Sequence, residues 1–507
     1  MQMKNNSIIF SDIPPQFKIF PNIISGVHRI STEIRNLGLT CQVIHHFSEF
    51  TDAELVTVLT KLVSDETPIV GFSTNFWGHA AAPGILKIIK PVSLIIEWIT
   101  QHYPDIRIIF GGASARIAFE HPFKKIDAIF EGFSDSVLKK YVESIRDGVE
   151  DPTPNELIND IKVYRSENKP DDFDFNTSKI TFHTDDHIQF GSTSVIETAR
   201  GCIFKCKFCA FPLNGKDKFD YIKDSETLRD ELIYNYEKYG IQYYILADDT
   251  FNDSTFKVEL LHKVFTSLPF KIKFSCYLRL DLINAHREQI PLLKEMGLVG
   301  TFFGIETFHH KAGQAVGKGM DPVKAKNLLN ELKTIHWPDI KISVGIIIGL
   351  PYETLESYEH LIDWINDPAN LVEMINCTAL KISTPLTRNI DPNLSIFQKN
   401  ASDYGFYWNS NDSENWKNLN GPVKDRKQAF EITDKVNQAI KESSRTLQGG
   451  FNMFQLWNLA KFIDTDITME KLIEMDRFKY KEYARTIVSN SNKTLFYKKY
   501  KEDILLL

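Results

Sequence analysis

Three of the six cysteines lie within eight positions, spaced Cys-x3-Cys-x2-Cys, at Cys202, Cys206 and Cys209. They follow a β-type run over residues 192–198, so we expect the thiols in a loop that leaves a strand. A [4Fe–4S] cluster normally takes four protein thiolates. A compact loop that offers three leaves one iron open for an exogenous ligand, and this is the chemistry that the spacing favours.

Zinc or plain structural thiols remain as alternatives for this loop. A structural zinc site usually takes four Cys or His ligands in paired spacings, but Cys41, Cys276 and Cys377 are scattered singly. The pair His309-His310 contains a further potential ligand, although its spacing does not require that role. A disulfide framework is not favoured in a long chain with few cysteines and no recognisable secretory signal.

The cysteine spacing resembles the signature of the radical S-adenosylmethionine (SAM) superfamily. In that family the open iron chelates the amino and carboxylate groups of SAM, and an electron from the cluster releases a 5′-deoxyadenosyl radical. The resemblance implies a [4Fe–4S] cluster on Cys202, Cys206 and Cys209, with SAM as the second cofactor. It also implies a small-molecule substrate and an electron donor of the flavodoxin or ferredoxin type.

The resemblance continues at the ends of the next two expected strands. Asp248 and Asp249 match the acidic motif that accepts hydrogen bonds from the SAM amino group, a task that suits carboxylates. Arg279 is similar to the basic residue that clamps the SAM carboxylate, and an ion pair with Asp281 is its alternative role. Ser275 is implied as a contact of the ribose hydroxyls.

Later segments imply the rest of the SAM site. Glu306, in a segment like the family's Gly-x-Glu-Ser, is expected to bind ribose or to order the basic residue opposite. Residues 345–354 resemble a strand followed by Gly-Leu-Pro-Gly-Glu-Thr, with Tyr352 in place of the second glycine. Ile347 and Gly349 of this segment are expected beside the adenine. The resemblance also implies that the backbone of Phe208 contacts the adenine. It implies a turn at Thr384-Pro385-Leu386-Thr387.

The chemistry-bearing segments fall in a region, residues 190–390, where strand-like and helical runs alternate six times. Six such units match the partial (β/α)6 TIM-like barrel of the radical SAM core, whose sites collect at the carboxyl ends of the strands. Strands are expected at 193–197, 242–247, 271–277, 299–305, 340–348 and 373–382, and helices near 225–239, 254–267, 286–296, 321–334 and 354–366.

Residues 1–150 predict an open α/β, Rossmann-like domain. Strands are expected at 17–20, 42–44, 68–74, 106–113 and 128–132, and helices at 30–37, 91–102 and 135–145. The strand that ends at Ser73 and the Gly111-Gly112 turn resemble the cobalamin-binding domain that precedes many radical SAM cores. Because ligands of open α/β sheets lie at the carboxyl edge, the loops after Ser73 and Gly112 are the expected neighbours of a corrinoid.

The known cobalamin loop Asp-x-His-x-x-Gly has no full match here. The nearest string, residues 26–31, lacks both the aspartate and the glycine, so we expect His28 at the surface or at a helix start, not on cobalt. Two alternatives remain for residues 1–150. The domain binds cobalamin without a lower histidine ligand, or it is kept only as a docking scaffold.

Two further regions flank the barrel. Residues 151–189 are polar and punctuated by proline, which indicates a connecting segment on the surface. Residues 391–507 predict a helical C-terminal region. We expect the aromatic residues of this region to pack in the core. The alternative is that they lie over the open side of the barrel. These residues are Trp408, Trp416, Phe451, Phe454 and Trp457.

Charge and length limit the class of protein. A net charge of −7 gives no electrostatic footprint for nucleic acid, and no apolar run approaches the roughly 20 residues of a membrane span. We therefore expect a cytoplasmic enzyme of several domains. The resemblance implies a cobalamin-dependent radical SAM methyltransferase. A cobalamin-independent radical SAM enzyme and a non-catalytic metal-binding scaffold are the alternatives.

Overall fold

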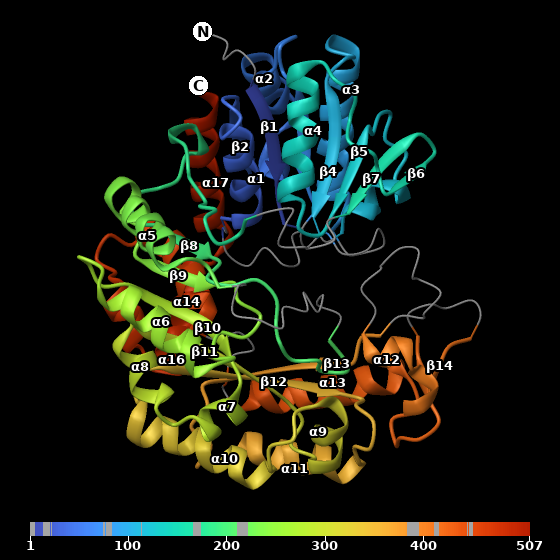
Figure 1. Cartoon of the computed structure of the whole chain (residues 1–507). Helices are drawn as coiled ribbons and strands as arrows, with labels where there is room; N and C mark the ends of the chain where they lie inside the picture. The colour runs from blue at the N-terminus through green and yellow to red at the C-terminus, as the bar shows by residue number, and fades with distance from the viewer. Residues whose placement is uncertain are drawn as a thin grey trace.

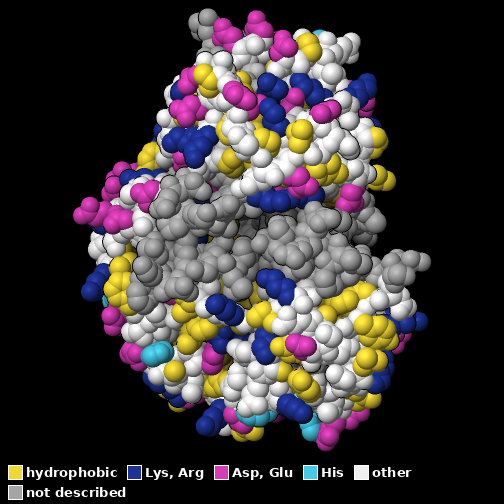
Figure 2. All heavy atoms as spheres, turned by 45° about the vertical axis from the view of Figure 1, so that its right-hand side comes forward, with side chains coloured by type: hydrophobic (Ala, Val, Ile, Leu, Met, Phe, Trp, Pro, Cys, Tyr) yellow, Lys and Arg dark blue, Asp and Glu magenta, His cyan; other side chains and the backbone are white. Residues whose placement is uncertain are grey.

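The computed structural model describes residues 6–13, 21, 23–74, 77, 84–112, 114–165, 174–209, 222–382, 395–409, 415–443, 445 and 450–506, without the side chains of 450–452. An N-terminal α/β domain lies above a larger α/β core, and the C-terminal helices contact both (Figure 1). The strand expected at 17–20 falls outside the described residues. On the face in Figure 2, basic, acidic and apolar side chains are interspersed over both parts.

The N-terminal domain is built on a seven-stranded sheet. Its strands are β1 (Asn6–Ser11), β2 (Thr40–His45), β3 (Ile69–Ser73), β4 (Arg107–Gly112), β5 (Ala128–Glu131), β6 (Glu156–Ile158) and β7 (Ile161–Arg165). The spatial order is β2-β1-β3-β4-β5-β7-β6, and every pairing except β6 with β7 is parallel. From β1 the chain adds β2 on one side and then β3, β4 and β5 on the other side. The direction in which strands are added therefore changes between β1 and β3, and the carboxyl ends of these two strands form a topological switch point.

Helices cover both faces of this sheet, which explains why β1 and β3 are buried over their whole length. One face packs against α1 (Ser25–Arg35) and α4 (Asp135–Asp147). The other packs against α2 (Asp52–Leu62), α3 (Leu86–His102) and the last helix of the chain, α17 (Asn490–Leu505).

The sheet extends into the segment expected to be a surface connector. β6 and β7 form an antiparallel hairpin on the edge of the sheet, and they account for residues 156–165. Asn159 and Asp160 join the two strands with φ values of 48° and 66°. Two residues with positive φ make the type I′ turn that hairpins favour. Residues 156–165 of the expected connector are therefore part of the N-terminal domain.

The core is a six-stranded parallel sheet, and the six strands expected from sequence are confirmed. They are β8 (Thr193–Ile196), β9 (Tyr243–Leu246), β10 (Lys273–Leu278), β11 (Leu298–Glu306), β12 (Lys341–Ile348) and β13 (Met374–Ala379), in sequential spatial order. Its helices are α5 (Ser225–Tyr239), α6 (Thr255–Thr266), α7 (Leu280–Ala285), α8 (Gln289–Glu295), α9 (His310–Val316), α10 (Pro322–Glu331), α11 (Leu355–Asn366) and α13 (Arg426–Glu442).

Strand alternation divides the core into a helix-covered face and an inner face. In β10, Phe274, Cys276 and Leu278 are buried in the hydrophobic cluster under the helices. The alternate residue Tyr277 remains 43% exposed. Because neighbouring strand residues point to opposite sides, Tyr277 lies on the inner face, where the sites of a barrel collect.

The C-terminal region contains α12 (Ile396–Lys399), the small β14 (Phe406–Tyr407) and β15 (Lys417–Asn418) pair, and the helices α14 (Gly450–Ile463), α15 (Met469–Glu474) and α16 (Arg477–Ile487) before α17. α14 crosses the amino-terminal ends of the core strands: Thr193 Oγ1 donates to the carbonyl of Phe454 at 2.9 Å. Trp416 and Phe454 are fully buried, as expected for core aromatics. Phe451 has no described side chain. No helix among the described residues is long and apolar enough to cross a membrane.

Candidate functional site

The cysteine loop leaves the carboxyl end of β8, as expected. Cys202, Cys206 and Cys209 are free thiols of intermediate exposure, whereas the three scattered cysteines are buried. The amide of Cys209 donates to the carbonyl of Cys206 at 3.0 Å, and the amide of Lys207 donates to the carbonyl of Val316 at 3.2 Å. Val316 ends α9, so the loop is braced by the segment that follows β11.

Two of the sulfur atoms have polar neighbours. Thr250 Oγ1 lies 3.4 Å from Cys202 Sγ, and Arg279 Nη1 donates to Cys206 Sγ at 3.4 Å. Burial raises the pKa of the Cys202 thiol, whereas the Thr250 hydroxyl lowers it. Donors and a nearby cation favour thiolates, and hydrogen bonds to sulfur tune iron–sulfur potentials. The three cysteines therefore fit the protein ligands of a cluster.

Among the side chains that the structure describes, no three His, Cys, Asp or Glu groups converge as they would around one metal ion. In a [4Fe–4S] cluster each thiolate binds a different iron, so a cluster site does not need such convergence. The zinc alternative for the cysteine loop stays open.

Arg279 has two roles in the structure. Its Nε and Nη2 donate to Asp281 at 3.1 and 2.6 Å, so the alternative ion pair is present. Its guanidinium carbon also lies 4.0 Å from the centre of the Phe204 ring, and Nη2 donates to the carbonyl of Gly317 at 3.3 Å. Arg279 thus holds the cysteine loop against the core, while its contact with a SAM carboxylate stays a prediction.

The structure separates the two carboxylates expected to bind the SAM amino group. Asp248 is 1% exposed, and its Oδ1 accepts from the amides of Thr198 and Ala199 at 2.9 and 3.1 Å. Its Oδ2 accepts from the Thr198 hydroxyl and pairs with Lys257 at 2.9 Å. Both oxygens of Asp248 are therefore occupied with the backbone that leads to the cysteine loop and with Lys257, which differs from the expected SAM contact.

Asp249, in the bend that follows, is partly exposed. Burial, followed by repulsion from Asp248, raises the pKa of Asp249 to about 6. A carboxylate destabilised in this way gains most from a cationic partner. Of the acidic pair, Asp249 is the residue that suits the SAM ammonium group.

Ser275 and Glu306 are more enclosed than their expected roles suggest. Ser275 is fully buried, and its hydroxyl has no hydrogen-bond partner among the described atoms. Glu306, with φ of 67°, pairs with Lys318 at 3.3 Å, and burial raises the pKa of its carboxyl. Glu306 therefore has Lys318 as a basic partner, while its ordering of the basic residue opposite and the ribose contacts of Ser275 and Glu306 stay predictions.

The turn after β12 contains a carboxyl that the sequence did not single out. Glu353 is 3% exposed and accepts from the amides of Gly349 and Leu350 at 3.3 and 3.1 Å and from Tyr358 Oη at 2.5 Å. Tyr352 has φ of 70°, a left-handed backbone that glycine adopts without strain and that a tyrosine rarely adopts. Glu353 thus fixes the turn that begins at Gly349.

The other adenine positions are only partly described. Ile347 is half-buried on β12, and Phe208 packs against the core cluster. A Cβ at Gly349 would lie 3.0 Å from the Trp416 ring, so this position admits no larger residue without displacement. The turn expected at 384–387 lies outside the described residues.

In the N-terminal domain, Ser73 and Gly112 end neighbouring strands at the carboxyl edge. Ser73 ends β3, beside the switch point, and Gly112 has φ of 118°, which disfavours any side chain. In the turn after β5, a Cβ at Gly132 would meet no atom of the described residues within 4 Å. Both expected corrinoid positions therefore share one edge of the sheet.

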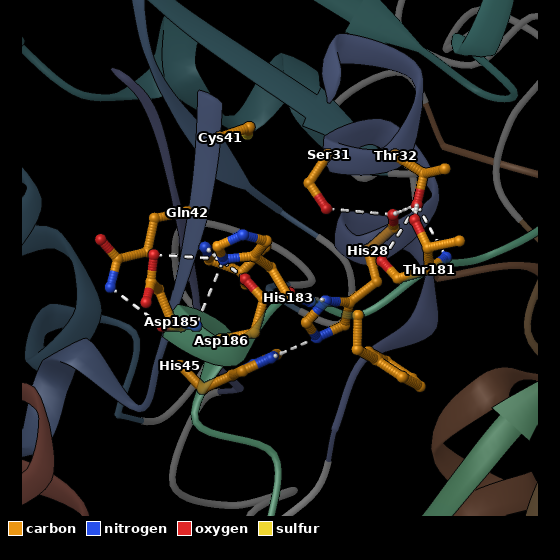
Figure 3. Close-up of polar contacts among 12 residues, drawn as sticks. His28, Ser31, Thr32, Cys41, Gln42, His45, Thr181, His183, Asp185 and Asp186 are labelled. Atoms are coloured by element: carbon orange, nitrogen blue, oxygen red, sulfur yellow. Dashed lines mark hydrogen bonds and ion pairs between the residues drawn. The ribbon is translucent and has the colours of Figure 1, made fainter. Parts of the chain in front are cut away.

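His28 is at a helix start, one of the two places expected for it, but it is not at the surface. It lies in the first turns of α1 and is 0% exposed. Figure 3 shows its ring between His45 and Asp186: its Nε2 is 2.8 Å from His45 Nε2, and its Nδ1 is 3.4 Å from Asp186 Oδ2. Arg35 pairs with the same carboxylate at 2.8 Å. Both ring nitrogens of His28 thus face protein groups, and neither is directed at a ligand.

Residues 196–365 match the family model described as the Radical SAM superfamily. The cysteine loop and the strand-end residues lie within this match, so this part of the chain is similar to the radical SAM domain, a family whose members use a [4Fe–4S] cluster and SAM.

Relatives and solved structures extend the likeness beyond that domain. An uncharacterized methyltransferase of Pyrococcus horikoshii is 22% identical over 335 residues, 61% of this chain and 66% of the relative, so the chain spans slightly less than two thirds of that relative. The radical SAM methyltransferase TsrM from Kitasatospora setae, with tryptophan and a SAM analogue bound, has a TM-score of 0.61 at 15% identity, over 81% of this chain and 80% of TsrM.

The cobalamin-dependent SAM radical enzyme OxsB, with aqua-cobalamin bound, has a TM-score of 0.59 at 13% identity, over 98% of this chain and 80% of OxsB. At such identities the likeness establishes the fold: an N-terminal α/β domain, a radical SAM core and a helical C-terminal region arranged as in these two enzymes.

Proposed function

We propose that this protein is a cobalamin-dependent radical SAM methyltransferase that acts on a small molecule. One observation carries the proposal: the carboxyl edge of the N-terminal sheet lies against the start of the cysteine loop. Phe133, which directly follows the Gly132 turn after β5, has its ring 4.4 Å from the guanidinium carbon of Arg200. Arg200 precedes Cys202 by two residues. A ligand at that edge would therefore lie beside the SAM site.

The described residues suit the corrinoid part of the proposal. The switch point, the positive φ of Gly112 and Gly132, where a Cβ would meet no described atom within 4 Å, provide a main-chain-lined edge that a large planar ligand can approach. His28 is enclosed by protein groups, so we propose that this chain gives cobalt no lower ligand from His28.

The residues of the core have separable tasks in this scheme. When bound, the cluster supplies the electron that cleaves SAM into methionine and a 5′-deoxyadenosyl radical. Asp249 accepts the SAM ammonium group, and Arg279 places a fixed positive charge beside Cys206 for the SAM carboxylate. Tyr277 and Phe302, with ring centres 5.4 Å apart, lie on the inner face of β10 and β11 and offer an aromatic wall to a substrate.

The solved relatives support the same function. TsrM is described as a radical SAM methyltransferase, and OxsB is described as a cobalamin-dependent SAM radical enzyme. The Pyrococcus horikoshii relative is also named as a methyltransferase. A reduced iron–sulfur enzyme needs an external electron source, and we propose a flavodoxin- or ferredoxin-type donor.

The test measures the products of SAM with and without a corrinoid. Reduced, cluster-loaded protein is expected to form 5′-deoxyadenosine in both cases. Hydroxocobalamin-loaded protein should in addition form S-adenosylhomocysteine, in proportion to the corrinoid retained, because methyl transfer from SAM leaves that product. 5′-Deoxyadenosine without corrinoid-dependent S-adenosylhomocysteine would favour a cobalamin-independent radical SAM enzyme. Loss of both products would favour a non-catalytic scaffold.

A further inference from the structure

Four charged side chains join the N-terminal domain to the residues that precede Cys202. Arg29 belongs to α1 and Asp135 to α4, both in the N-terminal domain. Glu197 directly follows β8, and Arg200 lies two residues before the first cysteine of the loop. We call these four residues the interdomain ion-pair cluster.

Direct contacts join these four charges to one another. Arg200 Nη1 donates to Asp135 Oδ2 at 2.8 Å, and its Nε donates to Glu197 Oε1 at 2.9 Å. Arg29 Nη2 donates to Glu197 Oε2 at 2.9 Å, and its Nε lies 3.9 Å from Asp135 Oδ1. Each carboxylate therefore faces both guanidinium groups.

The interdomain ion-pair cluster is removed from solvent. The side chains of Arg29, Asp135, Arg200 and Glu197 are 2%, 4%, 8% and 15% exposed. Burial acts to raise the pKa of Glu197, but the two arginines hold it well below its ordinary value. A buried charge that loses its partner is strongly unfavourable, so each member of the set restrains the position of the others.

Aromatic rings restrain Arg200 further. Its guanidinium carbon lies 4.4 Å from the Phe133 ring of the N-terminal domain and 4.9 Å from the Phe175 ring of the connecting segment. Such cation–π contacts fix the plane of a guanidinium group as well as its charge. Arg200 is therefore held by residues outside the radical SAM core.

The same backbone segment is fixed from the core by Asp248. Its carboxylate accepts from the amides of Thr198 and Ala199, which lie between Glu197 and Arg200. Side chains of the segment 197–200 thus attach to the N-terminal domain, while its main chain attaches to the end of β9. The direction in which the chain enters the cysteine loop depends on both attachments.

We propose that Asp135 and Arg29 are positioning residues for the iron–sulfur site: through Arg200 and Glu197, the docked N-terminal domain sets the conformation of the loop that carries Cys202. The cluster and SAM site would then be fully formed only when the N-terminal domain is in place. A ligand at the carboxyl edge of that domain, next to Phe133 and Asp135, would be sensed at the same loop.

The test removes one charge from the N-terminal domain and measures the iron–sulfur cluster. No corrinoid is added, so the outcome does not depend on whether a corrinoid binds. In Asp135→Asn, the reduced cluster is expected to show an altered EPR spectrum with SAM. The dissociation constant of SAM should rise by about 2- to 30-fold, the range that mutations in coupled networks produce. Asp135→Glu, which restores the charge, should recover both readouts. Arg29→Gln should reproduce the change through Glu197 if Asp135→Asn does not fold.

The matched control is Asp186→Asn, which removes another buried carboxylate of an arginine pair, with Arg35, away from the cysteine loop. It is expected to lower thermal stability while leaving the EPR spectrum and SAM affinity unchanged. A wild-type EPR spectrum and SAM affinity in the folded Asp135→Asn or Arg29→Gln protein would overturn the proposal. Equal spectroscopic changes in Asp186→Asn would overturn it as well, because they would indicate general loosening.

Discussion

At the scale of single residues, the cysteine loop is the part of the chain whose chemistry follows most directly from the sequence. Cys202, Cys206 and Cys209 are the partly exposed thiols, and donors lie 3.4 Å from two of their sulfur atoms. The buried cysteines differ: burial raises the pKa of Cys41 to about 12 and that of Cys276 well above its ordinary value. Buried thiols of that kind serve as packing.

Replacement of any cysteine of the loop by alanine should abolish the cluster. We expect anaerobically reconstituted wild-type protein to contain about four irons, a full cubane, and each loop variant to lose this content together with its visible absorbance. Cys41→Ala, Cys276→Ala and Cys377→Ala are the controls and should retain the iron. A full iron content in the triple variant of the loop would refute the assignment.

SAM affinity should depend on pH through Asp249. Its pKa is raised to about 6, and only the ionised carboxylate pairs with the SAM ammonium group. SAM binding should therefore weaken as the pH falls through about 6, by at most about tenfold per pH unit. Asp249→Asn should bind more weakly at neutral pH, by roughly 1.5–3 kcal/mol for a lost charge-assisted contact, and should lose the pH dependence. Titrations of wild type that do not change between neutral and mildly acidic pH would place the ammonium group elsewhere.

At the scale of elements, the turn after β12 depends on one buried carboxyl. Glu353 accepts hydrogen bonds from two amides and from Tyr358, and burial raises its pKa from 4.5 to about 7. Between these two pH values the carboxyl of Glu353 is protonated in the folded protein and ionised in the unfolded protein. Folding stability should therefore fall as the pH rises from about 4.5 to about 7, by at most roughly 1.4 kcal/mol per pH unit.

Denaturant titrations across this window test the role of Glu353. Glu353→Gln keeps an acceptor without the titration, so its free energy of unfolding should vary less with pH than that of wild type. Glu353→Ala leaves the amides of Gly349 and Leu350 unpaired and should be destabilised at every pH, by about 1–3 kcal/mol. An identical pH dependence in wild type and Glu353→Gln would show that another group titrates.

The strands of the core were predictable because each is a short apolar run between helical segments, the pattern of a parallel sheet buried on both faces. β1 was missed because its six residues begin with Asn6 and Ser7, which are polar yet buried. The hairpin of β6 and β7 was not predicted because the polar, proline-punctuated composition of residues 151–189 indicated a surface connector.

The roles of neighbouring site residues were harder to predict. Asp248 and Asp249 differ in burial although they are adjacent in sequence: Asp248 is buried and Asp249 is partly exposed. Which of the two is buried depends on Lys257, on the next helix, and on the Thr198 amide, contacts that only the folded chain creates. Arg200 was missed because its partner Asp135 lies in another domain. Glu353 was missed because the backbone of the turn that brings the amides of Gly349 and Leu350 to its carboxyl forms only in the folded chain.

At the scale of the whole molecule, the last helix connects the two ends of the chain. In Figure 1, α17 lies beside β2 of the N-terminal domain. Tyr500 and Ile504 are buried in the core cluster of that domain, and Tyr500 Oη accepts from the amide of His45 at 2.9 Å. Lys501 pairs with Glu54 of α2 at 3.0 Å. The C-terminal region thus holds the N-terminal domain as well as the core.

Removal of residues 489–507 should destabilise the N-terminal domain. Burial of a large apolar side chain contributes about 1.5–3 kcal/mol, so loss of Tyr500 and Ile504 should lower its melting temperature, measured by calorimetry. Lys501→Ala removes only a partly exposed ion pair and should cost at most about 1 kcal/mol. If the truncated chain melts like the full chain, α17 is not part of the stable fold.

The central claim is that the N-terminal domain holds a corrinoid beside the radical SAM site. The direct measurement is the visible absorbance of protein reconstituted with hydroxocobalamin and then desalted. We expect wild type to retain corrinoid and Gly112→Leu to lose it, because a side chain at φ of 118° is strained and projects from the carboxyl edge. His28 is buried, so His28→Ala is expected to reduce stability; its folded fraction should still retain corrinoid with an unchanged spectrum. A wild-type protein that emerges from desalting without corrinoid absorbance would contradict the account.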